Sequence, residues 1–121
     1  MIYNRHLIVD DAQINRYIIK RYLLKYNTTF IIDEAMNAES SVNYAKNNDY
    51  DIIFMDIKMP GKYDGIEASK LIREFKPNQT IYGFTGQVEE KNIKTMNRII
   101  EKPTSRQEIL KILDEYYVSQ G

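Results

Sequence analysis

Side chains able to take part in ionic and covalent chemistry stand directly after several short apolar runs of this sequence. They are Asp10, Asp11, Asp56, Thr85 and Lys102. Carboxylates that lie close together raise one another's pKa unless a cation joins them, and Mg²⁺ takes such oxygen ligands. A lysine and a threonine hydroxyl can neutralise and hydrogen-bond a phosphoryl group, and an aspartate can attack phosphorus. If the fold brings these residues together, they would suit phosphoryl transfer with Mg²⁺ as the cofactor.

The apolar runs alternate along the chain with longer segments of helical periodicity. The expected strands are residues 6–9, 29–33, 51–55, 80–84 and 98–100. The expected helices are residues 12–26, 38–47, 65–75, 87–96 and 105–117. Strands and helices in alternation, with continuous apolar strands, predict an α/β fold in which a parallel sheet is covered on both faces.

The carboxyl ends of parallel strands meet at one edge of the sheet, and ligands bind outside that edge. The five chemically active side chains all follow strands, so they are expected at this edge. Asp56 follows the central strand, which makes it the best placed nucleophile. The buried strand would fix its carboxylate for in-line attack, and phosphoryl transfer needs mainly positioning and charge stabilisation.

Two of the expected helices carry recognisable local patterns. In the helix at 12–26, one apolar face is formed by Ile14, Tyr17, Ile18 and Tyr22. Before the last helix, a capping box is indicated by Thr104 and Ser105, followed three residues later by Gln107 and Glu108.

Composition narrows the class of protein. The chain has 121 residues, enough for one domain with a core, and 17 basic and 17 acidic residues give a formal net charge of zero. This balance argues against direct binding to nucleic acid or to an anionic membrane. With no cysteine and a single histidine, His6, disulfides, thiol chemistry and multi-histidine metal sites are excluded. The chain lacks a membrane-spanning run and a signal-peptide core, so we expect a cytoplasmic protein.

Four motifs in order resemble the receiver domains of two-component response regulators. They are "LIVDDAQINR", "DIIFMDIKMPGKYDGIEA", "GFTG" and "IIEKP". The resemblance covers nearly the whole chain, so residues 1–121 are expected to form a single receiver domain. It implies the flavodoxin-like three-layer fold, with five parallel strands in the order 2-1-3-4-5 and five helices. Met1 and the lack of an effector segment slightly favour a stand-alone regulator.

The resemblance also implies how phosphorylation works. Asp56 would accept a phosphoryl group from a histidine kinase or a histidine phosphotransfer protein, and Thr85 and Lys102 would contact that group. The peptide between Lys102 and Pro103 would be cis. The domain would be a signalling phosphoacceptor that catalyses only its own phosphorylation and dephosphorylation, and it would signal to a downstream protein.

The metal site implied by the resemblance holds Mg²⁺. Asp11 would bind the ion directly, and Asp10 directly or through water. Asp56 and the main-chain carbonyl of Lys58 would complete the protein ligands.

The chain departs from the family pattern on its output side. The stretch between Thr85 and Lys102 is shorter than usual by about one helical turn. The position on the fifth strand that often carries an aromatic residue is Ile99. In the family, Thr85 and this position form the switch, which reshapes the face built from residues 87–96, 98–100 and 105–117. Because isoleucine has no ring to rotate, we expect switching here to order or shift residues 86–97.

Other interpretations of the same residues remain open. Asp10 and Asp11 could cap a helix, and Asp64 followed by Gly65 indicates a turn and helix start. A haloacid-dehalogenase-like phosphatase also uses an aspartate nucleophile, but it places an acid/base aspartate where Lys58 stands. A flavodoxin-type electron carrier would need a phosphate loop in place of Asp10 and Asp11. A receiver-like binding module that is never phosphorylated is the third alternative.

Overall fold

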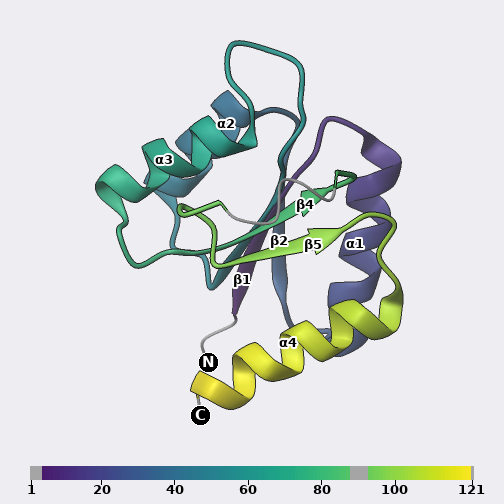
Figure 1. Cartoon of the computed structure of the whole chain (residues 1–121). Coiled ribbons are helices and arrows are strands. Elements are labelled where there is room, and N and C mark those ends of the chain that lie inside the picture. The colour runs from purple at the N-terminus through teal and green to yellow at the C-terminus, as the bar shows by residue number, and fades with distance from the viewer. Residues whose placement is uncertain (1–3, 88–92, 121) are drawn as a thin grey trace.

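A five-stranded parallel sheet forms the middle layer of the protein in a computed structural model, which describes residues 4–87 and 93–120 (Figure 1). Its strands are β1 (Arg5–Val9), β2 (Ile31–Ala35), β3 (Ile52–Asp56), β4 (Thr80–Thr85) and β5 (Arg98–Glu101). The strand order is β2-β1-β3-β4-β5, and every neighbouring pair is parallel. The predicted α/β flavodoxin-like topology is confirmed.

Four helices in the described residues cover the sheet. They are α1 (Gln13–Tyr26), α2 (Ala38–Asn47), α3 (Gly65–Phe75) and α4 (Arg106–Gln120). α3 begins with a reciprocal capping box, in which the Asp64 side chain accepts from the Glu67 amide and the Glu67 side chain accepts from the Asp64 amide. The interpretation of Asp64 and Gly65 as helix-start residues is therefore confirmed. The α4 capping box is present in half, because Ser105 Oγ accepts from the Glu108 amide.

The helices lie in two layers, with α2 and α3 on one face of the sheet and α1 and α4 on the other (Figure 1). Side chains alternate along each strand and so feed two separate cores. In β3, for example, Ile53 and Met55 belong to the core under α2 and α3, and Ile52 and Phe54 belong to the core under α1 and α4. Both faces of the sheet are buried, which is why its strands read as continuous apolar runs.

The helix expected at 87–96 is the main difference from prediction. Residues 88–92 lie outside the described residues, and residues 87 and 93–96 are not helical. The last part of this segment is held by side chains of α3. Ser69 Oγ lies 2.6 Å from Thr95 Oγ1, and Arg73 donates to the Thr95 carbonyl at 3.1 Å and to Asn97 Oδ1 at 2.6 Å. Tertiary hydrogen bonds to α3 take the place of helical ones there.

The predicted apolar face of α1 is wrong for three of its four residues, and only Tyr22 packs against the core. Ile14, Tyr17 and Ile18 are 62%, 52% and 39% exposed, whereas Ile19 and Leu23 are buried against the sheet. Both sets satisfy the spacing of a helical face, because apolar residues are spread around most of this helix. Periodicity therefore could not decide which stripe meets the core.

The second strand begins two residues later than predicted. The side chain of Asn27 accepts hydrogen bonds from the amide and the hydroxyl of Thr29, at 2.9 and 2.7 Å. This turn uses residues that the β-propensity of threonine had assigned to the strand. β2 consequently ends at Ala35, level with Val9 of β1.

A polar network ties the end of α4 to the amino-terminal edge of the sheet, opposite the edge that carries the acidic side chains. The buried His6 on β1 lies in edge contact with the Phe30 ring, and its Nε2 is 2.6 Å from the Tyr117 hydroxyl. Tyr117 also donates to Asp51 Oδ2 at 3.2 Å, and Tyr116 donates to the Asp51 carbonyl at 3.3 Å. His6 is thus a core residue. None of the described helices is long and apolar enough to cross a bilayer.

Candidate functional site

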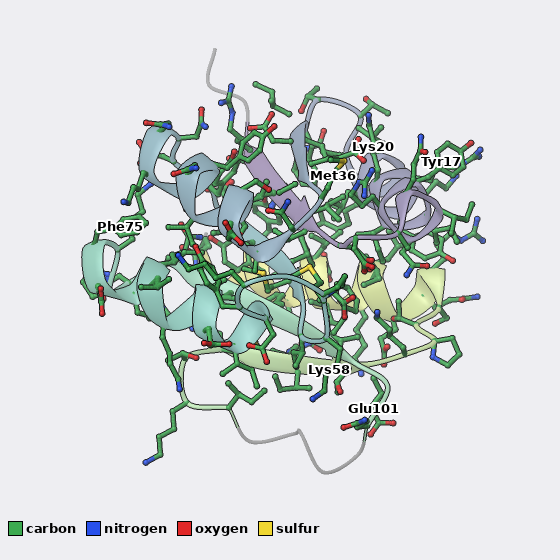
Figure 2. All side chains as sticks on the ribbon, turned by 90° about the horizontal axis from the view of Figure 1, so that it is seen from above. Tyr17, Lys20, Met36, Lys58, Phe75 and Glu101 are labelled. Carbon is green, nitrogen blue, oxygen red and sulfur yellow. The ribbon has the colours of Figure 1, made fainter. Side chains whose placement is uncertain are left out.

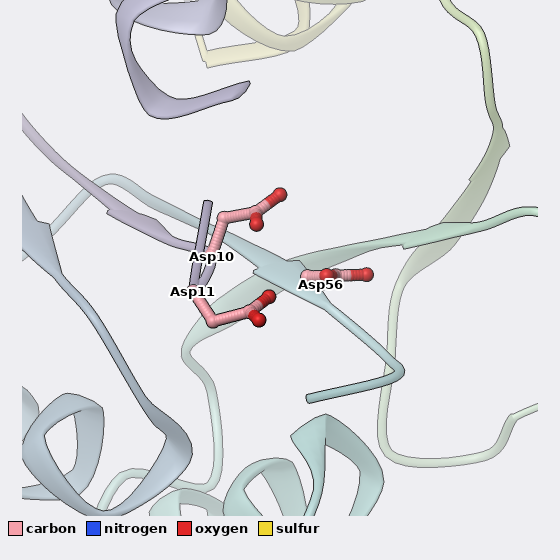
Figure 3. A group of neighbouring side chains, drawn as sticks. All are labelled: Asp10, Asp11 and Asp56. Carbon is pink, nitrogen blue, oxygen red and sulfur yellow. The ribbon is translucent and has the colours of Figure 1, made fainter. Parts of the chain in front are cut away.

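Three carboxylates meet at the carboxyl edge of the sheet. Asp10 and Asp11 follow β1, and Asp56 ends β3, the strand paired with β1 (Figure 3). Each can offer an oxygen within 4.8 Å of the others. Asp10 and Asp56 are buried and Asp11 is exposed, so the cluster opens to solvent on one side. The sequence prediction that these residues converge is confirmed.

Asp10 is held by its main chain and by its side chain. Its amide donates to the Ala35 carbonyl at the end of β2, at 3.1 Å. Its Oδ1 accepts from the Ala12 amide at 2.9 Å, which fixes the side chain over the turn into α1. The N-cap position of α1 is Ala12, which offers no side-chain cap. The alternative in which the acidic pair merely caps this helix is therefore wrong.

Asp56 sits in a tightly packed backbone corner. The next residue, Ile57, donates its amide to the Phe84 carbonyl of β4 and accepts from the Gly65 amide, both at 3.0 Å. A Cβ at Gly65 would lie 2.1 Å from the Asp56 carbonyl oxygen, so only glycine lets α3 approach this closely. The position of Asp56 is thereby fixed from β4 on one side and from α3 on the other.

Lys102 brings a positive charge into the cluster from the end of β5. Its Nζ donates to Asp56 Oδ1 at 3.0 Å and lies 3.7 Å from Asp10 Oδ2. Its amide donates to the Thr85 carbonyl at 2.8 Å, which aligns the loop with the end of β4. The Lys102–Pro103 peptide is cis, so that prediction is confirmed.

The electrostatics of the cluster favour an added cation. Burial raises the pKa of Asp56. The hydrogen bond and the charge of Lys102 oppose that rise, whereas the neighbouring charges of Asp10 and Asp11 add to it. Three carboxylates face one ammonium, so the group retains excess negative charge. Its oxygen ligands, two buried and one facing solvent, fit a divalent ion such as Mg²⁺, which keeps several waters.

The remaining predicted site residues lie on β4, in the loop after β3 and on β5. Thr85 ends β4 and is buried, and its hydroxyl accepts from the Gln87 amide at 3.0 Å and contacts the Gln87 carbonyl at 3.3 Å. Lys58 is exposed two residues after Asp56. Ile99 is half-buried on β5 and packs against the core under α2 and α3.

Gly83 on β4 leaves a space that other side chains fill. A Cβ at this position would lie 2.3 Å from the sulfur of Met96 and 3.2 Å from the Cδ1 atoms of Ile57 and Ile99. Met96 is buried, so the segment before β5 is packed directly onto β4 two residues before Thr85.

Sequence reasoning missed Arg16, which is 8% exposed on the sheet side of α1. Its guanidinium donates to the Asp10 carbonyl at 2.7 Å and to Glu34 Oε1 on β2 at 3.1 Å. The signal that could have found it is spacing, since Arg16 precedes Ile19 and Leu23 by three and seven positions. A charged residue on the buried stripe of a helix requires a partner.

A cavity of about 400 Å³ also adjoins the site between α1 and the loop after β5. Its walls are mostly apolar and include Ile18, Ile19, Phe54, Phe84 and Pro103. Asp10 and Lys102 lie at its border, so the cavity shares residues with the acidic cluster.

Comparison with known proteins agrees with this architecture. The family model described as the response regulator receiver domain matches residues 7–114. The chain therefore belongs to the response regulator receiver domain family.

Among its relatives is the autoinducer 1 sensor kinase/phosphatase LuxN of Vibrio harveyi, with 31% identity over 114 residues. That match covers 91% of this chain but only 13% of LuxN, so the chain spans a small part of that relative. Among solved structures, the receiver domain of Ssk1 from Saccharomyces cerevisiae, co-crystallised with the phosphotransfer protein Ypd1, is 27% identical. Its TM-score is 0.86, and 98% of this chain and 91% of that chain are covered.

The response regulator TrrA of Thermotoga maritima, solved in complex with Mg(2+)-BeF, is 25% identical to this chain. Its TM-score is 0.83, with 93% of this chain and 98% of that chain covered.

Proposed function

We propose that the protein is a phosphoacceptor in a two-component or phosphorelay pathway and that Asp56 is the residue phosphorylated. The observation that carries the proposal is the Lys102 ammonium, 3.0 Å from a buried Asp56 carboxylate that lies beside Asp10 and Asp11. This set offers a nucleophile, a fixed positive charge and oxygen ligands for a cation. Residues 1–121 would act as one receiver domain.

The donor is a phosphohistidine on a kinase or a phosphotransfer protein, in keeping with the similarity to the Ssk1 receiver solved with Ypd1. An Asp56 carboxylate oxygen attacks phosphorus, and the new O–P bond forms as the P–N bond breaks. The electron pair of that bond leaves with the imidazole nitrogen, which takes up a proton. Lys102 already touches Asp56, so it can neutralise the charge that gathers on the phosphoryl oxygens.

The cation site would be formed by carboxylate oxygens of Asp10, Asp11 and Asp56 and by the Lys58 main-chain carbonyl. Bound Mg²⁺ would supply charge neutralisation for the incoming phosphoryl group. Asp10 is firmly oriented for this role, because both its amide and its Oδ1 are hydrogen-bonded. The Mg(2+)-BeF complex of the similar TrrA supports this assignment.

The output would pass through Thr85 and Ile99. On phosphorylation the Thr85 hydroxyl would leave Gln87 and donate to a phosphoryl oxygen. Ile99 is branched at Cβ and has no ring to rotate, so the response would be a shift of the packed segment that contains Met96. The segment carries the signal to a downstream protein.

The test is phosphorylation of the purified chain with acetyl phosphate and Mg²⁺, followed on a phosphate-affinity gel. The wild type should give a retarded band, and Asp56→Asn should abolish it. Asp49→Asn is the matched control, since it makes the same change at an exposed residue before the other end of β3. A retarded band in Asp56→Asn would overturn the assignment. Absence of any band in the wild type would favour the unphosphorylated binding module, and steady release of phosphate would favour the phosphatase.

A further inference from the structure

Arg16 lies outside the acidic cluster but contacts its backbone. Its side chain crosses from α1 to the end of β1, where NH1 donates to the Asp10 carbonyl at 2.7 Å. That carbonyl belongs to the peptide that joins Asp10 to Asp11. A hydrogen bond to one side of a planar peptide fixes the orientation of the whole unit. Arg16 thereby sets the direction in which the chain enters Asp11.

Asp11 is the ligand candidate that most needs such support. Among the described residues, no hydrogen bond or ion pair holds its carboxylate, and its side chain is exposed. Asp10 and Asp56, in contrast, are both buried and both contacted by Lys102. The place of the Asp11 carboxylate therefore depends on its backbone.

The guanidinium is itself anchored at its other edge. Nε donates to Glu34 Oε1 on β2 at 3.1 Å, and Lys20 approaches Oε2 of the same carboxylate at 3.6 Å. The residue after Glu34 is Ala35, whose carbonyl accepts from the Asp10 amide. Ala35 thus holds the Asp10 amide directly, and Glu34 holds the Asp10 carbonyl through Arg16.

We infer that Arg16 is a positioning residue for the cation site, which it serves by locking the Asp10–Asp11 peptide against the end of β2. The inference rests on the proposed function, because it assigns Asp11 to a Mg²⁺ site. Second-layer residues that orient metal ligands typically change affinity by about tenfold or more when removed. Arg16 contacts the Asp10 carbonyl and Glu34 rather than the three carboxylates of the proposed site, so its effect would pass through the backbone.

The substitution Arg16→Met removes both hydrogen bonds and keeps most of the apolar stem. Lys20→Met is the matched control, because it removes one cation from the same Glu34 cluster on the same helix without contacting Asp10. Figure 2 shows Lys20 beside Tyr17 on α1, and the Lys20 ammonium lies 3.6 Å from Glu34 Oε2 on the edge strand β2. Ile112→Val, in the core under α4, controls for loss of stability alone.

The measurement is Mg²⁺ titration of each full-length variant, followed by NMR and by calorimetry. We expect Arg16→Met to bind Mg²⁺ about tenfold more weakly than the wild type, and both controls to stay within about twofold. Arg16→Lys should recover part of the loss, because an ammonium can reach the Asp10 carbonyl or Glu34 but lacks the planar fork. Without metal, Arg16→Met alone should move the amide signal of Asp11.

Each outcome separates this inference from the function on which it rests. Should Arg16→Met bind Mg²⁺ as well as Lys20→Met does, the positioning role is wrong while the cation site stands. An affinity loss matched by Ile112→Val would also overturn the role, because general destabilisation would explain it. If Arg16→Met does not fold, Glu34→Gln, which weakens the anchor of Arg16, must lower Mg²⁺ affinity for the role to stand. No Mg²⁺ binding by the wild type would overturn the cation site and this inference together.

Discussion

Acidification should weaken the fold through His6, far from the acidic cluster. The imidazole is fully buried against Phe30 and the Tyr117 hydroxyl, and burial lowers the pKa of His6 from 6.5 to about 4. The unfolded chain therefore takes up a proton at a higher pH than the folded one. The stabilisation from the neutral, buried ring is complete above the unfolded pKa and is lost as the pH falls through the folded pKa.

The size of the effect follows from the two pKa values. A pKa difference of one unit corresponds to about 1.4 kcal/mol between the protonation states. Between about pH 8 and about pH 5, His6 becomes protonated in the unfolded chain while it stays largely neutral in the folded one. The free energy of unfolding should therefore fall by about 2 kcal/mol over this range. Burial raises the pKa of Asp51 and of Asp56, so protonation of these carboxyls favours the folded state and partly offsets the loss.

A non-titrating variant isolates the contribution of His6. His6→Gln keeps an amide near the Tyr117 hydroxyl and leaves Asp51 and Asp56 in place, so their pH dependence is common to both proteins. Urea unfolding followed by circular dichroism at each pH gives the two stability curves. The wild type should lose about 2 kcal/mol more than the variant on acidification. Parallel curves, or a His6 ring that titrates near its ordinary pKa by NMR, would refute the reasoning.

Two further substitutions test the packing and the charge of the acidic cluster. Gly65→Ala should lower the free energy of unfolding by about 2 kcal/mol in urea, because its methyl group meets the Asp56 carbonyl. Gly86→Ala, which meets nothing within 4 Å, should be nearly neutral, and equal losses would contradict the packing argument. Lys102→Met should raise the pKa of Asp56 further in a carboxyl-detected NMR titration, whereas Lys111→Met, on the exposed side of α4, should leave it unchanged. A pKa that stays or falls in Lys102→Met would show that the ammonium does not stabilise the carboxylate.

The convergence of the acidic cluster was predictable because it depends only on which residues follow the apolar runs of the sequence. Asp10, Asp56 and Lys102 each follow an apolar run, and a parallel sheet brings the ends of such runs to one edge. No knowledge of side-chain packing is needed for that step. The strand order came from the family resemblance, and the registers of β1, β3 and β4 agree with it.

The predictions were wrong where two sequence patterns fitted equally well and only tertiary contacts determined which of them is buried. On α1, the stripe with Ile14 and Ile18 and the stripe with Ile19 and Leu23 both fit a helical face, and only the packed sheet selects the second. Arg16 belongs to the selected stripe, so its role was hidden by the same ambiguity. Its partners, the Asp10 carbonyl and Glu34, come from two other elements that sequence spacing does not connect.

The space above Gly83 couples the evolution of two positions, residues 83 and 96. Because the Met96 sulfur occupies the place of a side chain on β4, residues 83 and 96 share one volume, and their substitutions should not be additive. A lineage that enlarges residue 83 first meets an overlap, whereas one that shortens residue 96 first meets only a void. The order of the two changes therefore determines whether the intermediate is overpacked or underpacked. Receiver sequences that carry a larger residue at position 83 should carry a smaller one at position 96.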